Sequence, residues 1–393
     1  MSAGGSAAPR PRVLVLSSRG IDSSLWHAPQ YEFEDVIAEV DSVRLVAPPP
    51  PPRSELRDYL REGVQLAWKS ALALRGRSPA DRSPPVAEGE IDGDYDLFFA
   101  VFHFPQDLDQ LRSIRGWRAR CRKAICYVIE LWTADFPDYD RYLALLADFD
   151  TVYVFNPAVV EPVARIAGRR PEYLALGVDT LRFSPYPEPV ERTIDVLAYG
   201  RRSPEAHRQL AAMAERRELF YVHDTIRQSP MVDYRQHRVL LASYARRSRY
   251  AMAYRINEDR LVRTGGDEGL TARLFEITAA GAVMLGTPPR CAEFERYFGW
   301  PDAMIEIPWA EPDMAAVLAD LDAQPERMAA IGRRNAVNGL LRHDWVYRWG
   351  QVLEAAGLPP LPAFDARVAR LRTLAEAADA TEATEAALAG TPR

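Results

Sequence analysis

The 393-residue sequence predicts an α/β fold of two Rossmann-like domains that face each other across a cleft. Short β-branched or aromatic runs alternate with segments of helical spacing along the chain, which is typical of βα units in a parallel sheet. The segment 183–192 interrupts this alternation, because Pro185, Pro187 and Pro189 can continue neither a helix nor a central strand. The chain is long enough for two cores, so we place the domain boundary at this segment.

Each half of the chain holds its own set of strand candidates. Those of the first half are 12–17, 42–46, 95–103, 123–131, 151–155 and 173–176. Those of the second half are 194–199, 219–222, 249–254, 282–285 and 304–307. Helical spacing is clearest at 54–75, 157–168, 203–217, 232–245 and 325–338. The pattern predicts a first domain over 12–185 and a second over 190–345, with irregular tails at 1–11 and 376–393 that have little to bury.

Composition excludes several classes of protein. The formal net charge of −6 argues against nucleic acid as the main partner, because such proteins neutralise phosphates with excess Lys and Arg. No run approaches the roughly 18 apolar residues of a membrane span, and the first residues lack an apolar signal region, so we expect a cytoplasmic protein. Cys121, Cys126 and Cys291 form neither a C-x-x-C pair nor an even set, which disfavours zinc and disulfides.

We also expect no metal and no bound cofactor. The histidines are scattered singly, without a metal-binding pair. Asp92-Gly93-Asp94 and Asp94-Tyr95-Asp96 match a D-x-D pattern, but they precede a strand candidate rather than follow one. Carboxylates that grip a cation would be expected after the strand, so we interpret these residues as a polar loop.

The segment 265–281 carries the most chemical information. Its glycine-bearing loop leads into a helix that we expect to begin near Leu270, and a helix N-terminus offers free amides and partial positive charge to a phosphate. Glu268 lies just before that helix and Glu276 lies inside it, so the two carboxylates can accept hydroxyl hydrogen bonds on either side of a diphosphate. The plainer alternatives are a pairing of Glu276 with Arg273 on the helix surface and a helix-stabilising charge at Glu268.

Because Lys69 and Lys123 are the only lysines, a phosphate bound in the second half must be met by arginine, backbone amides or a helix end. Arg201 follows a strand candidate and Gly200, from where an arginine can reach a diphosphate. A surface arginine is the alternative.

The spacing from Glu268 to Glu276 resembles the Glu-x7-Glu segment of retaining glycosyltransferases of the GT-B fold, the family-4-like group, also called glycosyl transferases group 1. The Arg-Leu-Phe-Glu run at 273–276 is similar to the spore-maturation-type branch. The resemblance implies transfer of a sugar from a nucleotide-diphosphate sugar to an acceptor, with retained anomeric configuration and without a metal. It places Glu268 at the donor sugar and Glu276 at the ribose hydroxyls. It also places the amides of Gly269, Leu270 and Thr271 near the diphosphate.

Other segments resemble the same family in order and spacing. Leu176 to Asp179, followed by Phe183-Ser184-Pro185, is similar to the junction that ends its first, acceptor-binding domain. The strand 194–199 with Arg201 is similar to the start of its second, donor-binding domain. The segment from Asp344-Trp345 to Leu353 resembles the closing helix, so we expect the helices of 346–375 to cross back to the first domain. The family's second-domain lysine is replaced by His207 and Arg208, and we expect Arg208, with Arg273, to contact the donor.

On the first domain, His103 ends a strand at the edge where ligands bind in open parallel sheets. In the resembling family a histidine there contacts the donor sugar, and a structural histidine is the alternative. Glu130 and Asp135 are weaker candidates for the same cleft. The basic stretch 112–123 has the composition of an element that touches anionic lipid or an acidic acceptor. A solvated helix face is the favoured explanation, and peripheral contact at the inner membrane face stays open as the alternative.

The expected partners are therefore a nucleotide sugar and an acceptor that is a glycan, a lipid or a small molecule. Two other functions stay open. One is different chemistry on a sugar nucleotide, such as epimerisation or hydrolysis, and the other is a catalytically silent binding protein of the same fold.

Overall fold

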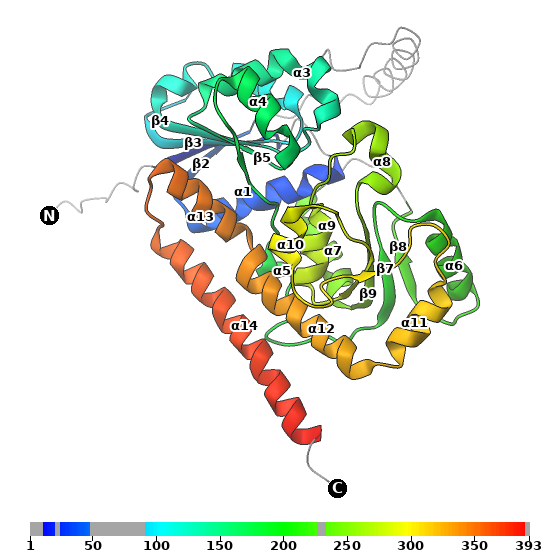
Figure 1. Ribbon diagram of the computed structural model, residues 1–393. Coiled ribbons are helices and arrows are strands. Elements are labelled where there is room, and N and C mark those ends of the chain that lie inside the picture. The colour runs from blue at the N-terminus through cyan, green and yellow to red at the C-terminus, as the bar shows by residue number, and fades with distance from the viewer. Residues whose placement is uncertain (1–10, 20–23, 48–90, 226–232, 390–393) are drawn as a thin grey trace, which may run out of the picture.

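Two parallel sheets form the framework of the molecule (Figure 1). The computed structural model describes residues 11–19, 24–47, 91–225 and 233–389. Within them, the first sheet has six strands in the order β2-β1-β3-β4-β5-β6, and the second has five in the order β11-β10-β9-β7-β8. The predicted α/β fold of two Rossmann-like domains is confirmed.

Every predicted strand is present, with bounds that differ by a few residues. The first sheet contains β1 (Val13–Leu16), β2 (Val43–Val46), β3 (Tyr95–Phe102), β4 (Cys121–Val128), β5 (Thr151–Val154) and β6 (Glu172–Tyr173). The second contains β7 (Ile194–Ala198), β8 (Tyr221–His223), β9 (Ser248–Tyr254), β10 (Val283–Thr287) and β11 (Ile305–Glu306). The β-branched and aromatic runs identify these strands because most are buried on both faces, as parallel strands usually are.

Helices cover both faces of each sheet. Those of the first domain are α1 (Ala28–Val40), α3 (Phe136–Leu143), α4 (Val160–Ala167) and α5 (Thr180–Phe183). Those of the second are α6 (Pro204–Glu215), α7 (Tyr234–Arg246), α8 (Asn257–Thr264), α9 (Ala272–Ala279), α10 (Ala292–Phe298), α11 (Met314–Asp322) and α12 (Pro325–Asn338). The closing helices are α13 (Trp345–Ala356) and α14 (Pro362–Ala389). The predicted helix 54–75 lies outside the described residues, and the C-terminal segment expected to be irregular from 376 is helical as far as Ala389.

Both sheets reverse their strand order at one point, between β1 and β3 in the first and between β7 and β9 in the second. Loops that leave neighbouring strands on opposite sides of such a point open a crevice at the carboxyl edge, where ligands of doubly wound folds bind. The segments that follow these four strands therefore mark where a site is expected.

The chain crosses between the domains at two places that lie together. The segment after α5 leads into the second domain, and Asp344 leads back out of it. Val178 forms a parallel bridge with Asp344, and the Val178 amide donates to the His343 carbonyl at 3.0 Å. Returning to the first domain, α13 stacks Trp345 on Phe33 with ring centroids 4.5 Å apart. Figure 1 shows α14 starting near α13 and running away from the first domain alongside α12.

A buried arginine on α7 ties the second domain to the first. Arg238 is 1 % exposed and lies between two carboxylates. Its Nε donates to Oε2 of Glu32 on α1 at 2.7 Å, and its Nη1 donates to Glu276 on α9. The Tyr199 hydroxyl donates to the other oxygen of Glu276 at 2.9 Å. We call Glu32, Arg238 and Glu276 the interdomain triad.

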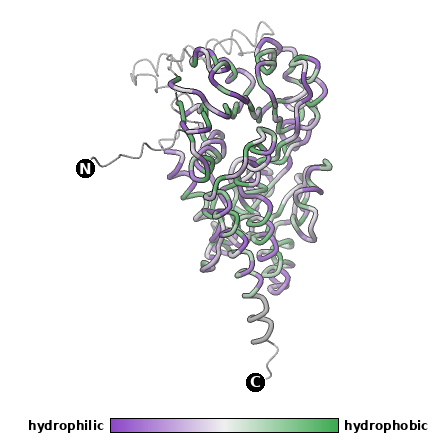
Figure 2. The backbone as a smooth tube through the Cα atoms, turned by 90° about the vertical axis from the view of Figure 1, so that its left-hand side faces the viewer, coloured by the Kyte–Doolittle hydropathy of each residue, from purple (hydrophilic) through white to green (hydrophobic). Residues whose placement is uncertain are grey.

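Hydropathy follows the same organisation. Apolar and polar stretches alternate along the tube in Figure 2, as expected for helices and strands that bury one side. Among the described helices, none has the length and apolar character that a transmembrane segment requires.

The first prediction concerns the interdomain triad. Replacing Arg238 with Ala leaves two carboxylates buried without their counter-ion, and breaking a buried pair in this way costs about 3–5 kcal/mol. We expect urea denaturation to show a loss of that size in the free energy of unfolding.

Arg235→Ala is the matched control, because Arg235 also lies on α7 and also pairs with α1. Its side chain is 60 % exposed and binds Asp35 at 2.9 Å, so its loss should cost about 0–1 kcal/mol. Equal losses in the two variants would contradict a special role for the triad.

Candidate active site

The loop between α8 and α9 lies against the first domain. Gly265 ends α8 with φ of +68°, and α9 begins at Ala272, slightly later than predicted. A Cβ at Gly269 would stand 2.6 Å from the ring of Phe155, so only glycine permits this close approach. Leu270 is buried, with 1 % of its surface exposed. Of the three amides predicted to meet a diphosphate, only that of Thr271 belongs to the residue that caps α9.

Glu268 extends from this loop toward the switch point of the second sheet. Arg255, directly after β9, donates from Nη1 to Glu268 Oε1 at 3.3 Å. Among the described residues, none forms a hydrogen bond with Oε2, although that atom is buried. Burial raises the pKa of Glu268 above its ordinary value, while the charge of Arg255 acts in the opposite direction. The carboxylate is thus held by one oxygen and has acceptor capacity left on the other.

Two arginines meet at the first turn of α9. Arg201 follows β7 and is held by an ion pair with Asp259 of α8. Arg273 donates from Nη1 to the Arg201 carbonyl at 3.3 Å, and its guanidinium carbon lies over the Tyr199 ring, 5.3 Å from the ring centroid. Within the described residues, no carboxylate forms an ion pair with Arg273. Burial lowers its pKa, and the nearby charge of Arg201 lowers it further.

Glycine at position 200 makes this arrangement possible. A Cβ there would stand 2.4 Å from Nη2 of Arg273, and the residue has φ of +66°, which glycine adopts without strain. Gly200, directly before Arg201, therefore leaves room for the side chain of Arg273. The pattern of predicted strands does not reveal this second arginine.

Glu276 is not placed as the resemblance implies. It is 3 % exposed, and both of its oxygens are engaged, one by Arg238 and the other by Tyr199. A ribose hydroxyl has no open surface of this carboxylate to contact while the interdomain triad is formed. The alternative pairing with Arg273 is absent among the described contacts as well.

Arg208 also lies away from the site. Its side chain is 69 % exposed and binds Glu205 one turn earlier on α6, at 3.0 Å from Nε. Because α6 starts at Pro204, the residue falls on the outer face of that helix. The expectation that Arg208 replaces the missing lysine is therefore not met in this arrangement, and Arg273 is the cation that lies beside Arg201.

His103 follows β3 at the switch point of the first sheet and is buried, with 6 % of its surface exposed. Its ring lies 4.6 Å from that of His27. Burial lowers its pKa well below the ordinary value, and the charges of His27 and of Arg263 on α8 lower it further. The imidazole is therefore neutral near pH 7.

The two weaker candidates have structural partners. Glu130 accepts from Nε1 of Trp132 at 3.0 Å and approaches Arg263 across the cleft at 3.7 Å. Asp135 accepts from the Trp132 amide at 3.1 Å and so stabilises the turn after β4.

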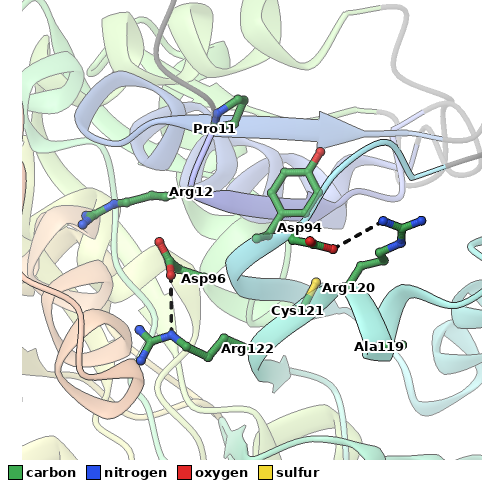
Figure 3. A pocket seen from close by; sticks show the side chains of 9 residues that line it. Pro11, Arg12, Asp94, Asp96, Ala119, Arg120, Cys121 and Arg122 are labelled. Atoms are coloured by element: carbon green, nitrogen blue, oxygen red, sulfur yellow. Dashed lines mark hydrogen bonds and ion pairs between the residues drawn. The ribbon is translucent and has the colours of Figure 1, made fainter.

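A hollow of about 430 Å³ lies at the opposite edge of the first sheet, where β3 and β4 begin (Figure 3). Asp94 pairs with Arg120 at 3.4 Å, and Asp96 pairs with Arg122 at 3.5 Å. Asp94 precedes β3, in agreement with the predicted polar loop, whereas Asp96 lies within the strand. The hollow is on the wrong edge to belong to the crevice between the domains. No group of three metal-binding side chains occurs in the part of the chain that the structure describes.

Sequence reasoning missed the partners of the predicted residues. Arg238 and Glu32 hold Glu276, Arg255 holds Glu268, and Asp267 binds the first domain. The position of Arg255 directly after a predicted strand is a signal that was present in the sequence. The others carry no local signal.

Comparisons with known proteins support the two-domain fold. Residues 221–354 match the family described as "Glycosyl transferase-like". A search of curated protein sequences found no match. Among solved structures, an alpha-glucosyltransferase bound to UDP and a DNA 13-mer containing an HMU base aligns with a TM-score of 0.52 and 10 % identity, over 89 % of this chain and 100 % of that one.

The same kind of enzyme bound to UDP-glucose and DNA containing an abasic site aligns with a TM-score of 0.50 and 8 % identity, again over 89 % and 100 % of the two chains. At such low identity the similarity to these structures supports the fold alone. The family match concerns the second domain and the start of the closing helices. The spore-maturation-type branch stays a prediction. Taken together, the two facing parallel sheets give this chain a fold similar to that of GT-B glycosyltransferases, and its residues 221–354 match the glycosyl transferase-like family.

Proposed function

We propose that the chain transfers a sugar from a nucleotide-diphosphate sugar to an acceptor with retention of configuration and without a metal ion. The observation that carries the proposal is the meeting of Arg201 and Arg273 at the first turn of α9, with Glu268 on the loop that leads into it. Two cations and a helix N-terminus suit a diphosphate, and a carboxylate nearby suits the hydroxyls of a sugar.

The diphosphate is the expected partner of Arg273. A largely buried guanidinium without a carboxylate partner is unfavourable, and an anion would relieve both its desolvation and its repulsion by Arg201. Arg201 would then share its charge between Asp259 and the diphosphate. This pair takes the role that the resemblance gives to an arginine and a lysine.

Glu268 is the group proposed to hold the donor sugar. Its Oε1 is fixed by Arg255, which leaves Oε2 to accept from a sugar hydroxyl. The alpha-glucosyltransferase structures that share the fold contain UDP and UDP-glucose, so uridine diphosphate sugars are the first donors to examine.

In the proposed reaction the acceptor oxygen attacks the anomeric carbon from the face that the diphosphate leaves. The bond from that carbon to the phosphate oxygen breaks, and the acceptor proton passes to the departing oxygen. Arg201, Arg273 and the α9 amides stabilise the negative charge that develops on the leaving group. A metal would supply the same neutralisation, and two arginines make it unnecessary.

The neutral imidazole of His103 supports a role at the sugar rather than at a phosphate, because it can exchange hydrogen bonds with hydroxyls without adding charge.

We also propose that the protein is located in the cytoplasm. Pairing of Arg118, Arg120 and Arg122 with aspartates weighs against a membrane contact through the basic stretch.

The second prediction tests the charged groups. Arg201→Ala, Arg273→Met and Glu268→Gln should each lower kcat/KM for the donor by about 10²–10³-fold, because each removes a group that stabilises developing charge or orients the sugar. Steady-state assays on purified, folded variants measure this effect. Arg216→Ala is the control, since its exposed side chain pairs with Glu218 on the outer surface. A wild-type rate in any of the three removes that residue from the mechanism.

The third prediction identifies the donor. A thermal-shift screen over uridine, guanosine, adenosine and thymidine diphosphate sugars should raise the Tm of the wild type with one nucleotide series. The shift should be lost in Arg273→Met. Product analysis with that donor then separates transfer from epimerisation or hydrolysis, which need no acceptor. No shift with any donor would contradict nucleotide-sugar binding.

The fourth prediction concerns pH and His103. Its folded-state pKa is lowered, so below about pH 6.5 the unfolded chain binds a proton that the folded chain does not. The contribution of His103 to stability is therefore present above that pH and is lost as pH falls. Between pH 7.5 and 5.5 the free energy of unfolding should fall about 1 kcal/mol more for the wild type than for His103→Gln. Parallel pH profiles would show that His103 titrates normally.

A further inference from the structure

Asp267, the residue before Glu268, points its side chain across the cleft into the first domain. Its Oδ2 accepts from the Thr133 amide at 2.7 Å and from Nδ2 of Asn156 at 2.7 Å. Its Oδ1 accepts from the Thr133 hydroxyl at 2.9 Å. Three donors of one domain thus converge on one carboxylate of the other, and hydrogen bonds to an ionised acceptor are the stronger kind.

The donors are rigidly placed. Thr133 lies in the turn after β4, and Asn156 follows β5, the neighbouring strand. Asn156 is 1 % exposed, and its Oδ1 accepts from the Ala158 amide at 3.0 Å, which fixes the direction of its Nδ2. The receiving surface for Asp267 is therefore part of the first-domain framework.

The loop itself is shaped for this contact. A Cβ at Gly265 would stand 3.2 Å from the Thr133 hydroxyl oxygen, and one at Gly269 would overlap Phe155. On the other side, Nδ2 of Asn257 donates to the carbonyls of Gly266 and Asp267, each at 3.0 Å. The loop is thus bound by Asn257 of α8 and packs closely against the first domain at both of its ends.

We propose that Asp267 is a positioning residue that makes the placement of Glu268 depend on domain closure. The two neighbouring side chains have different partners, Asp267 in the first domain and Glu268 at Arg255 in the second. When the domains meet, the three bonds to Asp267 fix the loop and with it the carboxylate that orients the sugar. When they separate, the loop is held only from its own domain. This inference rests on the proposed role of Glu268.

The test removes the acceptor from the second domain. Asp267→Ala leaves the Thr133 amide, the Thr133 hydroxyl and Nδ2 of Asn156 without the carboxylate. Asp267→Asn is the conservative variant, because its carbonyl oxygen can replace Oδ2 and accept from Thr133 and Asn156, while its NH2 group donates to the Thr133 hydroxyl. Asp302→Asn is the matched control, because it removes the same charge from a surface pair within the second domain.

The first readout is hydrogen exchange at the Thr133 amide, which requires no activity. We expect exchange to accelerate about tenfold or more in Asp267→Ala, which is the size of one lost charge-assisted bond, and to stay closer to the wild-type rate in Asp267→Asn. The control should exchange like the wild type. Wild-type exchange in Asp267→Ala, or equal acceleration in Asp267→Ala and Asp267→Asn, would overturn the proposal.

The second readout separates positioning from general damage. In Asp267→Ala, kcat for the donor found in the thermal-shift screen should fall about tenfold or more, with a smaller fall in Asp267→Asn. Affinity for uridine diphosphate, or for the matching diphosphate of another base, should stay unchanged because the arginines provide it. Equal loss of both would overturn a role through Glu268. If the wild type transfers no sugar, the proposed function fails, whereas the exchange data still report the contact itself.

Discussion

The geometry of the cleft depends on one desolvated cation. Arg238 is buried between Glu32 of the first domain and Glu276 of the second, and neither carboxylate alone satisfies it. A buried charge is tolerated only when it is paired and hydrogen-bonded, so the two domains must meet in one register. That register brings the carboxyl edges of both sheets into opposition and places Glu130 beside Arg263 of α8. The geometry of the site therefore depends on how the charge of Arg238, which lies outside the site, is neutralised.

The sequence was sufficient for the fold because its signals are local. Runs such as 95–102 and 248–254 are mostly apolar, with a charged residue only near the start of each, as strands buried on both faces usually are, and the prolines of 183–192 mark the crossing between domains. Residues directly after strands, Arg201 and His103, were also found, because strand ends at a switch point line the crevice whatever the tertiary detail.

The remaining parts of the site required tertiary information. Glu276 has the expected spacing from Glu268, but its role is set by Arg238, which is 38 positions away. Arg208 was chosen by its distance along the chain from Arg201, and the face of α6 on which it falls points outward. In the sequence, nothing distinguishes Asp267 from the other acidic residues of its polar loop. Its partners Thr133 and Asn156 lie 134 and 111 positions away along the chain. Spacing identifies which residues can share a site, whereas partners decide what each one does there.

The two crossings between the domains lie side by side, joined by the bridge between Val178 and Asp344. Paired crossings act as a single pivot, and rotation about a pivot moves distant points more than near ones. The loop that carries Asp267 and Glu268 contacts the turns after β4 and β5, whereas the pivot adjoins α5 and α13. A small rotation of one domain about this pivot would therefore leave the pivot almost unchanged, while it separates this loop from the first domain.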